Sequence, residues 1–374
     1  MIWKKGTLAD FMGDFVVYRN LEPMDPRLDG LQAVWAEIGL DHYYVPRKTT
    51  PAYATALLHY VQAAQGVRGV SSPVEQLLFI GDTLMNDGTA ARNLGRHLPM
   101  MGFIGADRLG DPKSVEIDDG LMVANRWAAL ADFMDWVEDA DFPCGEATAL
   151  LIDLDKTSLG ARGRNDHVIN DARVEAVKRT MRGALGDDFD EAAFRAAYEP
   201  LNDQKYHYFT ADNQDYLAYI CLMVNGGIYT PDELWSALED GVFEGIEDFV
   251  AACEARRERM SPALEEAHGE VLRGIEAEDP TPFKAFRRGE YFETIERMDV
   301  LPDDAPAGDV LDSEIVLTSE VAQVADAMAA RGVLIFGISD KPDEASVPTE
   351  ADTADGYRAI HHTPMKVYGE KVVS

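Results

Sequence analysis

The sequence predicts an α/β fold in which a three-layer, Rossmann-like parallel sheet carries an inserted, mostly helical domain. Before residue 160, and again near the C-terminal end, short apolar runs alternate with amphipathic segments, which is typical of parallel strands joined by helices. Between these parts strand patterns nearly vanish and helical segments follow one another. We therefore predict a discontinuous core domain formed by residues 1–164 and 308–374, and a helical domain at residues 165–307.

Composition limits the classes of partner. The 374 residues carry a formal net charge of −33, from 67 acidic and 34 basic side chains, so a phosphate backbone or an anionic lipid surface would be repelled. We expect no nucleic-acid or membrane partner. No apolar run approaches the length of a membrane helix, and the N-terminal residues lack the apolar core of a signal peptide. We therefore expect a cytoplasmic protein whose three cysteines are ordinary thiols.

The first part of the chain reads as alternating strands and helices up to a short polar linker at residues 139–146. Apolar and β-branched runs predict strands, and spacing of three to four residues between apolar side chains predicts helices. The predicted strands are residues 14–18, 41–45, 77–80 and 101–104, and the predicted helices are residues 27–39, 51–64, 89–98 and 120–138.

The remaining elements complete the predicted core and its insertion. The insertion is expected to hold helices at residues 171–185, 191–198, 231–239, 246–258 and 262–276. After it, apolar spacing predicts a helix at residues 319–331, and the run Val333–Ile338 predicts a buried strand. The acidic stretch at residues 343–374 has no clear pattern.

Polar side chains follow three of the predicted strands at the points where the strands end. Asp153 and Asp155 follow the apolar run 149–152, Asp82 and Asp87 follow the run 77–80, and Ser339 follows Ile338. In open α/β sheets the carboxyl ends of the strands form the ligand site. Carboxylates gathered there repel one another, and a hard divalent cation with oxygen ligands, such as Mg²⁺, would offset that repulsion.

Phosphoryl transfer to an aspartate requires a metal ion, carboxylates, a hydroxyl group and an ammonium group. One carboxylate attacks phosphorus, and a second protonates the leaving oxygen and later activates water. The ammonium and hydroxyl groups hold phosphate oxygens. Lys48, next to the predicted strand 41–45, is the best candidate for the ammonium; Lys341 and Lys366 are alternatives.

These residues resemble the motifs of the haloacid-dehalogenase-like superfamily of phosphohydrolases. The family's first motif, an apolar strand followed by Asp-x-Asp-x-Thr, is matched at residues 153–157, and its second, a Ser or Thr closing a strand, at Ser339. Its third motif, a lysine at a helix start, is matched best by Lys48. Its fourth, Gly-Asp with a further acid four or five residues on, is matched by Gly81-Asp82 and Asp87.

The order of the motifs along the chain differs from that of the family. The family has them in the order one, two, three, four, whereas this chain has the third and fourth motifs before the first and second. A circular permutation explains this order, because the termini of compact domains often lie close together and permutants at surface loops fold. The linker at residues 139–146 would then join the segments that form the N- and C-termini in unpermuted members of the family. The helical insertion lies between the first and second motifs, where the family carries a cap over its active site.

The resemblance implies a role for each matched residue. Asp153 would be the nucleophile and Asp155 the general acid and base, while Ser339 and Lys48 would bind phosphate. Mg²⁺ would be held by the Asp153 carboxylate, the Asp155 carbonyl and Asp82. Asp87 would support the metal site or accept a hydrogen bond from Lys48.

The expected activity is hydrolysis of a small, soluble phosphomonoester. An acid at position 155 favours phosphate esters, because dehalogenating members of the family lack one. A phosphotransferase of the same fold and a receiver-like protein that binds metal and ligand without catalysis are the alternatives. We also note Arg162, Arg164, the aromatic group 206–208 and the pair His361-His362 as polar or aromatic features, without assigning them to the site.

Overall fold

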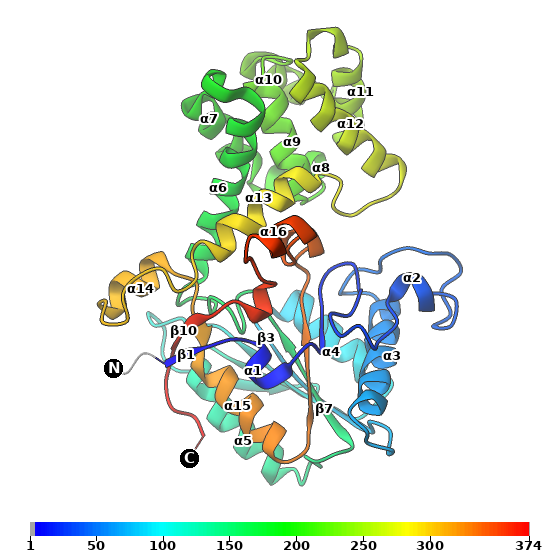
Figure 1. Cartoon of the computed structure of the whole chain (residues 1–374), viewed down its shortest axis with the longest axis vertical. Helices are drawn as coiled ribbons and strands as arrows, with labels where there is room; N and C mark the ends of the chain where they lie inside the picture. Colours follow the sequence, from blue (N-terminus) through cyan, green and yellow to red (C-terminus); the bar gives the residue numbers. More distant parts are fainter. Residues whose placement is uncertain (1–3, 374) are drawn as a thin grey trace. The chain divides into compact units, whose positions relative to one another are not determined.

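The computed structural model describes residues 4–373 and divides into two compact units (Figure 1). Unit 1 combines Met1–Asn170 with Thr294–Ser374, and unit 2 is Asp171–Glu293. Unit 1 is an α/β domain built on a mostly parallel sheet, which confirms the predicted fold class at that level. No helix within residues 4–373 combines the length and apolar character needed to cross a membrane.

A seven-stranded sheet forms the centre of unit 1. Its strands, in spatial order, are β2 (Val16–Val17), β9 (Leu334–Ile338), β7 (Thr148–Asp153), β3 (Gln76–Gly81), β4 (Met100–Gly105), β6 (Leu121–Ala124) and β5 (Val115–Asp118). All neighbouring pairs are parallel except β5 with β6. Every residue of β7 and β9 is buried, as expected for central strands that are covered on both faces.

Helices cover both faces of this sheet (Figure 1). Alternate strand residues, among them Phe79, Leu151 and Phe336, pack in one cluster with apolar residues of α3 (Pro51–Val67) and α4 (Thr89–Leu94). Contacts on the strands also come from α1 (Ala9–Met12), α5 (Leu130–Asp139) and α15 (Ser319–Ala330). The period-two alternation of a strand separates its two faces in this way. The remaining helices of unit 1 are α2 (Leu31–Val34), α14 (Ala307–Ser313) and α16 (Glu350–Ala354).

A small second sheet joins segments from near the two ends of the chain. Strand β10 (Met365–Tyr368) pairs antiparallel with β1 (Lys4–Gly6) and parallel with β8 (Leu317–Thr318). Residues 343–374, which had no predicted structure, thus supply one strand. Lys366 of β10 is fully buried and its ammonium contacts both carboxylate oxygens of Glu314 at 2.9 Å.

Unit 2 is helical. Its helices are α6 (Asp166–Leu185), α7 (Glu191–Leu201), α8 (His207–Thr210), α9 (Gln214–Asn225), α10 (Pro231–Glu239), α11 (Ile246–Glu254), α12 (Pro262–Glu276) and α13 (Lys284–Ile295). Their apolar faces form a separate core that surrounds α9, nine of whose twelve residues are buried. Local signals set several helix starts: Thr230 and Glu233 form a capping box before α10, and Pro231 occupies its first turn.

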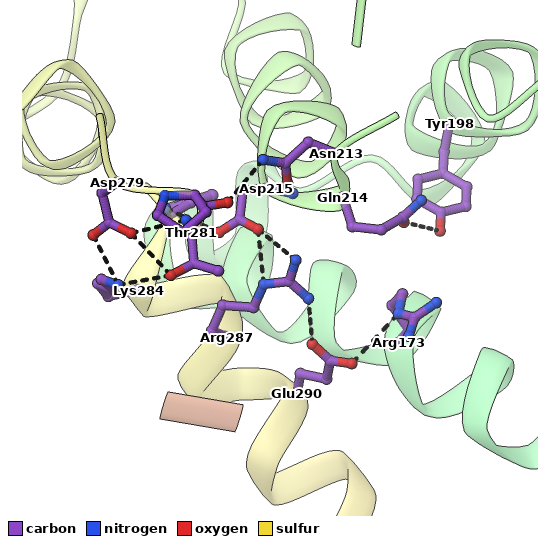
Figure 2. Close-up of polar contacts among 12 residues, drawn as sticks. Arg173, Tyr198, Asn213, Gln214, Asp215, Asp279, Thr281, Lys284, Arg287 and Glu290 are labelled. Atoms are coloured by element: carbon purple, nitrogen blue, oxygen red, sulfur yellow. Dashed lines mark hydrogen bonds and ion pairs between the residues drawn. The ribbon is translucent and has the colours of Figure 1, made fainter. Parts of the chain in front are cut away.

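A buried ion-pair network ties together three helices of unit 2 (Figure 2). Arg287 of α13 donates from Nε to Asp215 Oδ2 of α9 at 2.8 Å and from Nη1 to Glu290 Oε2 at 2.7 Å. Arg173 of α6 reaches the other oxygen of Glu290 at 3.4 Å. Asp215 also accepts the backbone N–H of Phe283 at 3.0 Å. Burial raises the pKa of Asp215, so its charge depends on these partners.

Three predicted elements of the first part are wrong. Residues 41–45 form no strand, and only residues 31–34 of the predicted helix 27–39 are regular α-helix. Residues 120–138 are not one helix, because Leu121–Ala124 is strand β6 and α5 begins only at Leu130. Asp119 (φ 47°) and Gly120 (φ 75°) form a tight turn that joins β5 to β6. Asp-Gly is favoured where both residues need positive φ, so the sequence held a hairpin signal that the apolar spacing of residues 121–136 obscured.

Candidate functional site

The predicted site residues meet at the carboxyl edge of the large sheet, because the strands that carry them are neighbours. Strand β7 lies between β3 and β9 and is parallel to both, with Ile152 opposite Ile80 and Asp153 opposite Ile338. Asp82 follows β3, Asp153 ends β7 and Ser339 follows β9. The expected side-by-side arrangement of the three strands is therefore observed.

Lys48 lies between two buried carboxylates. Its Nζ is 2.5 Å from Asp153 Oδ1 and 2.5 Å from Asp87 Oδ1, and its side chain is 4% exposed. The chain positions it just before α3, whose start is set by the N-cap Thr50 and by Pro51. Lys48, the preferred one of the three candidate lysines, thus contacts Asp153 directly. Lys366 instead lies in the small sheet with Glu314 and Asp299.

Asp87 lies in the turn that follows β3, and this turn directs its side chain back toward the end of the strand. This turn is a single π-helical segment, Leu84–Gly88, a geometry often found at functional sites. Asp87 Oδ2 accepts hydrogen bonds from the backbone N–H groups of Asp82 at 3.1 Å and Thr83 at 2.8 Å, and from the Thr83 hydroxyl at 2.9 Å. One oxygen thus holds the turn and the other contacts Lys48.

Gly81 makes room for Asp87. A Cβ at Gly81 would lie 2.4 Å from Asp87 Cβ and 2.6 Å from Asp87 Cγ, so Gly81→Ala must displace the turn. We expect the variant to lose about 1–3 kcal/mol of unfolding free energy and to bind divalent cations more weakly, as measured by urea unfolding and calorimetry. In the control Gly66→Ala, on α3, the new Cβ meets no atom within 4 Å, so that variant should be as stable as the wild type or more so. Equal effects of the two substitutions would contradict this account of Gly81.

Burial and mutual repulsion control the charges of the site. Burial, with the neighbouring Asp87, raises the pKa of Asp82 to about 7 against the effect of Arg162. Burial also raises the pKa of Asp153 well above its usual range, although Lys48 opposes it. For Asp87 the effect of burial is outweighed by Lys48 and by hydrogen bonds, which hold its pKa below the usual range. The Lys48 pKa is raised, because Asp153 and Asp87 together outweigh its burial.

The three carboxylates have the donor set of a hard divalent cation. Oxygens of Asp82, Asp87 and Asp153 lie within 4.8 Å of one another. Lys48 and Arg162 supply two positive charges against these three negative ones, so one negative charge is left over when all three acids are ionised. Mg²⁺ takes carboxylate oxygens and water in an octahedral shell. The residues present therefore fit Mg²⁺ by type and by charge.

Asp155 and Ser339 both lie close to Lys341. The Asp155 carboxylate is outside the three-acid cluster; its Oδ2 is 4.0 Å from the Lys341 ammonium and its side chain is 23% exposed. Ser339 is buried, and its Oγ accepts the backbone N–H of Lys341 at 3.0 Å. Lys156 has a positive φ of 62°, a strained conformation for a residue of this type, and lies directly after Asp155 in the loop.

Arg162, which the sequence analysis noted without assigning it to the site, contacts one of the site carboxylates. Its Nε contacts Asp82 Oδ2 at 2.5 Å, and its side chain is 35% exposed. The neighbouring Gly163 (φ +76°) has no space for a Cβ, which would lie 1.9 Å from the Asp107 carbonyl oxygen. This close approach holds the loop that carries Arg162. The next arginine, Arg164, belongs to a different network with Asp107 and Glu320.

Tyr53, beside Lys48, is a residue that the sequence analysis missed. Its hydroxyl is buried and has no hydrogen-bond partner among residues 4–373. Burial raises its pKa, and the charges of Lys48, Asp340 and Asp153 act on it. A buried hydroxyl without a partner costs free energy, and a bound oxyanion would satisfy it. The only signal in the sequence was its position five residues after Lys48, in the first turn of a helix that begins with proline.

Comparisons with known proteins returned nothing: no family model, no curated protein and no solved structure matches this chain.

Proposed function

We propose that the protein is a Mg²⁺-dependent phosphatase that hydrolyses a small phosphomonoester through an aspartyl-phosphate at Asp153. The observation that carries the proposal is the pair of contacts from Lys48 to Asp153 and Asp87, beside Asp82 at the ends of adjacent strands. This arrangement would provide a nucleophile, a cation for phosphate oxygens and a set of metal ligands within one buried site.

In the first step an Asp153 oxygen attacks phosphorus, the new O–P bond forms, and the bond to the leaving alcohol breaks. Asp155 in its acid form gives its proton to the leaving oxygen. Ser339, Lys48 and Lys341 would bind the phosphate oxygens. When bound to Asp82, Asp87 and Asp153, Mg²⁺ would neutralise charge on the carboxylates and the phosphate.

In the second step Asp155, now ionised, takes a proton from a water molecule that attacks phosphorus. The O–P bond to Asp153 breaks, inorganic phosphate leaves, and both carboxylates return to their starting states. Asp155 is suited to this exchange because it is partly exposed and its carboxylate lies outside the metal cluster. Arg162 would leave Asp82 when the cation binds and so become available to the substrate.

The proposal includes membership of the haloacid-dehalogenase-like superfamily in permuted form. It is supported by the order β9-β7-β3 in the sheet, which brings the second, first and fourth motifs together in space although they are far apart and rearranged in the sequence. The lysine of the third motif contacts the nucleophile of the first.

The direct test is Mg²⁺-dependent hydrolysis of p-nitrophenyl phosphate, followed by a panel of small phosphomonoesters. We expect turnover that stops when EDTA is added and resumes with Mg²⁺. Turnover that needs no metal would refute the mechanism. Binding of Mg²⁺ and phosphate without any turnover would instead favour the receiver-like alternative.

Mg²⁺ affinity should rise with pH up to about pH 7. A protonated carboxyl cannot ligate a metal, and the Asp82 pKa is raised to about 7, so below that pH cation binding must displace a proton. The affinity should fall by up to about tenfold for each pH unit below 7. Calorimetry in buffers of different ionisation enthalpy would measure both the affinity and the released proton. An affinity that is constant between about pH 5.5 and 8 would contradict the raised pKa.

A further inference from the structure

A second group of possible metal ligands lies in unit 1, formed by Asp14, His361 and His362. Each offers one ligand atom, and these atoms lie within 4.8 Å of one another. The Nε2 atoms of both histidines approach the same carboxylate oxygen, Asp14 Oδ1, His361 at 3.2 Å and His362 at 2.7 Å. Asp14 lies before β2 and the histidines lie near the other end of the chain, so tertiary folding alone brings the group together.

We propose that these three side chains bind a borderline divalent transition-metal ion, of which Zn²⁺ is the representative. Two imidazoles and one carboxylate form a ligand set that Zn²⁺ and its neighbours accept, with remaining positions open to water. Mg²⁺ prefers oxygen ligands. The site is separate from the three-carboxylate cluster and does not depend on the proposed phosphatase activity.

The distances are close to those of a metal site. With metal–ligand bonds of about 2.0–2.1 Å in a tetrahedral arrangement, neighbouring ligand atoms are about 3.3 Å apart. The separation of 3.2 Å between His361 Nε2 and Asp14 Oδ1 already fits. The 2.7 Å separation to His362 must lengthen, and this is easy because the His362 side chain is 47% exposed.

The second ring nitrogen of His361 has a partner that can orient the ring. The His361 side chain is fully buried, and its Nδ1 is 3.0 Å from the Tyr18 hydroxyl. The ring approaches Asp14 through its Nε2, which is 3.2 Å from Oδ1. A hydrogen bond at the other ring nitrogen orients metal-bound histidines and sets their tautomer. Tyr18 supplies that contact here.

Access and charge also favour a cation at this place. Asp14 is 43% exposed, so an ion can reach the group from solvent. The net charge of −33 attracts cations to the protein. An ion bound here would link the residues before β2 to the C-terminal segment and would stabilise the folded chain, because the unfolded chain does not hold the three ligands together.

The test is titration of the metal-free full-length protein with Zn²⁺ in saturating Mg²⁺, by calorimetry and by thermal unfolding. We expect one Zn²⁺ per chain and a higher melting temperature. His362→Ala and Asp14→Asn should each weaken binding at least about tenfold and remove the thermal shift, and Tyr18→Phe should weaken it less. Both ligand substitutions are at exposed side chains, and circular dichroism would verify their folding.

Two control variants separate this site from others. His97→Ala removes an exposed histidine elsewhere, and Asp153→Asn alters the carboxylate cluster; both should bind Zn²⁺ as the wild type does. Co²⁺ should give visible ligand-field bands that His362→Ala abolishes. Zn²⁺ binding that survives both His362→Ala and Asp14→Asn, that is lost only in Asp153→Asn, or that is absent from the wild type would overturn the proposal.

Discussion

Replacement of Asp153 by asparagine is expected to lower the turnover of the proposed phosphatase at least about 10³-fold. Asparagine has nearly the same shape but lacks the nucleophilic oxygen, so the covalent step cannot proceed. The variant should fold, since it removes one charge from a site in which three buried carboxylates repel one another. We expect its melting temperature to equal or exceed that of the wild type, as is common when a strained functional site is relaxed.

The measurement is kcat with p-nitrophenyl phosphate at saturating Mg²⁺, together with the melting temperature of each variant. Asp135→Asn, at an exposed position on α5, is the matched control and should have wild-type turnover. Asp155→Asn should also lose turnover, but it should retain Mg²⁺ affinity better than Asp153→Asn because its carboxylate lies outside the cluster. Full activity of Asp153→Asn would disprove the assignment of the nucleophile.

Replacement of Arg287 by alanine is expected to destabilise the helical unit by about 3–5 kcal/mol. Asp215 is fully buried, and its Oδ2 accepts from the Arg287 guanidinium. Without Arg287 this carboxylate would have to take up a proton or stay charged in an apolar core, and either outcome costs free energy. Glu290 also loses its contact with Arg287, which is 2.7 Å.

Urea unfolding followed by far-UV circular dichroism would measure this loss, because unit 2 is helical. Arg195→Ala, on α7, is the matched control: it removes an arginine whose ion pairs with Glu191 and Glu199 are exposed. Such pairs contribute little, so the control should change stability by no more than about 0.5 kcal/mol. If Arg287→Ala were as mild as Arg195→Ala, the buried network of Figure 2 would not be a stabilising feature.

The central part of the fold was predictable because its signals are local. Apolar runs that end in aspartate or serine identified β3, β7 and β9, and the expectation that their polar ends meet followed from the common geometry of parallel sheets. The spatial order of the strands did not follow from their order along the chain. Strand β7 lies between β3, which starts 72 residues before it, and β9, which starts 186 residues after it. The motif resemblance supplied that expectation.

The features that the sequence left unassigned depend on tertiary contacts. Arg162 resembled any loop arginine until Asp82, 80 residues away, was found beside it. His361 and His362 were isolated in the sequence, because their partner Asp14 is 347 and 348 residues distant. The strand predicted at residues 41–45 failed for a different reason: aromatic and β-branched residues favour strands only where a neighbouring strand is available to pair with them.

Strands β7 and β9 are neighbours in the sheet, but the ribosome synthesises them far apart in time. Strand β7 ends at Asp153, whereas the strand that covers its edge ends only at Ile338. The ribosome synthesises the whole of unit 2, Asp171–Glu293, after β7 and before β9. Unit 2 can therefore fold before β9 is made. The nascent sheet meanwhile keeps an open edge, which is a hazard for aggregation. Ser339 is added directly after β9, so the sheet and the candidate site are completed at the same point of synthesis.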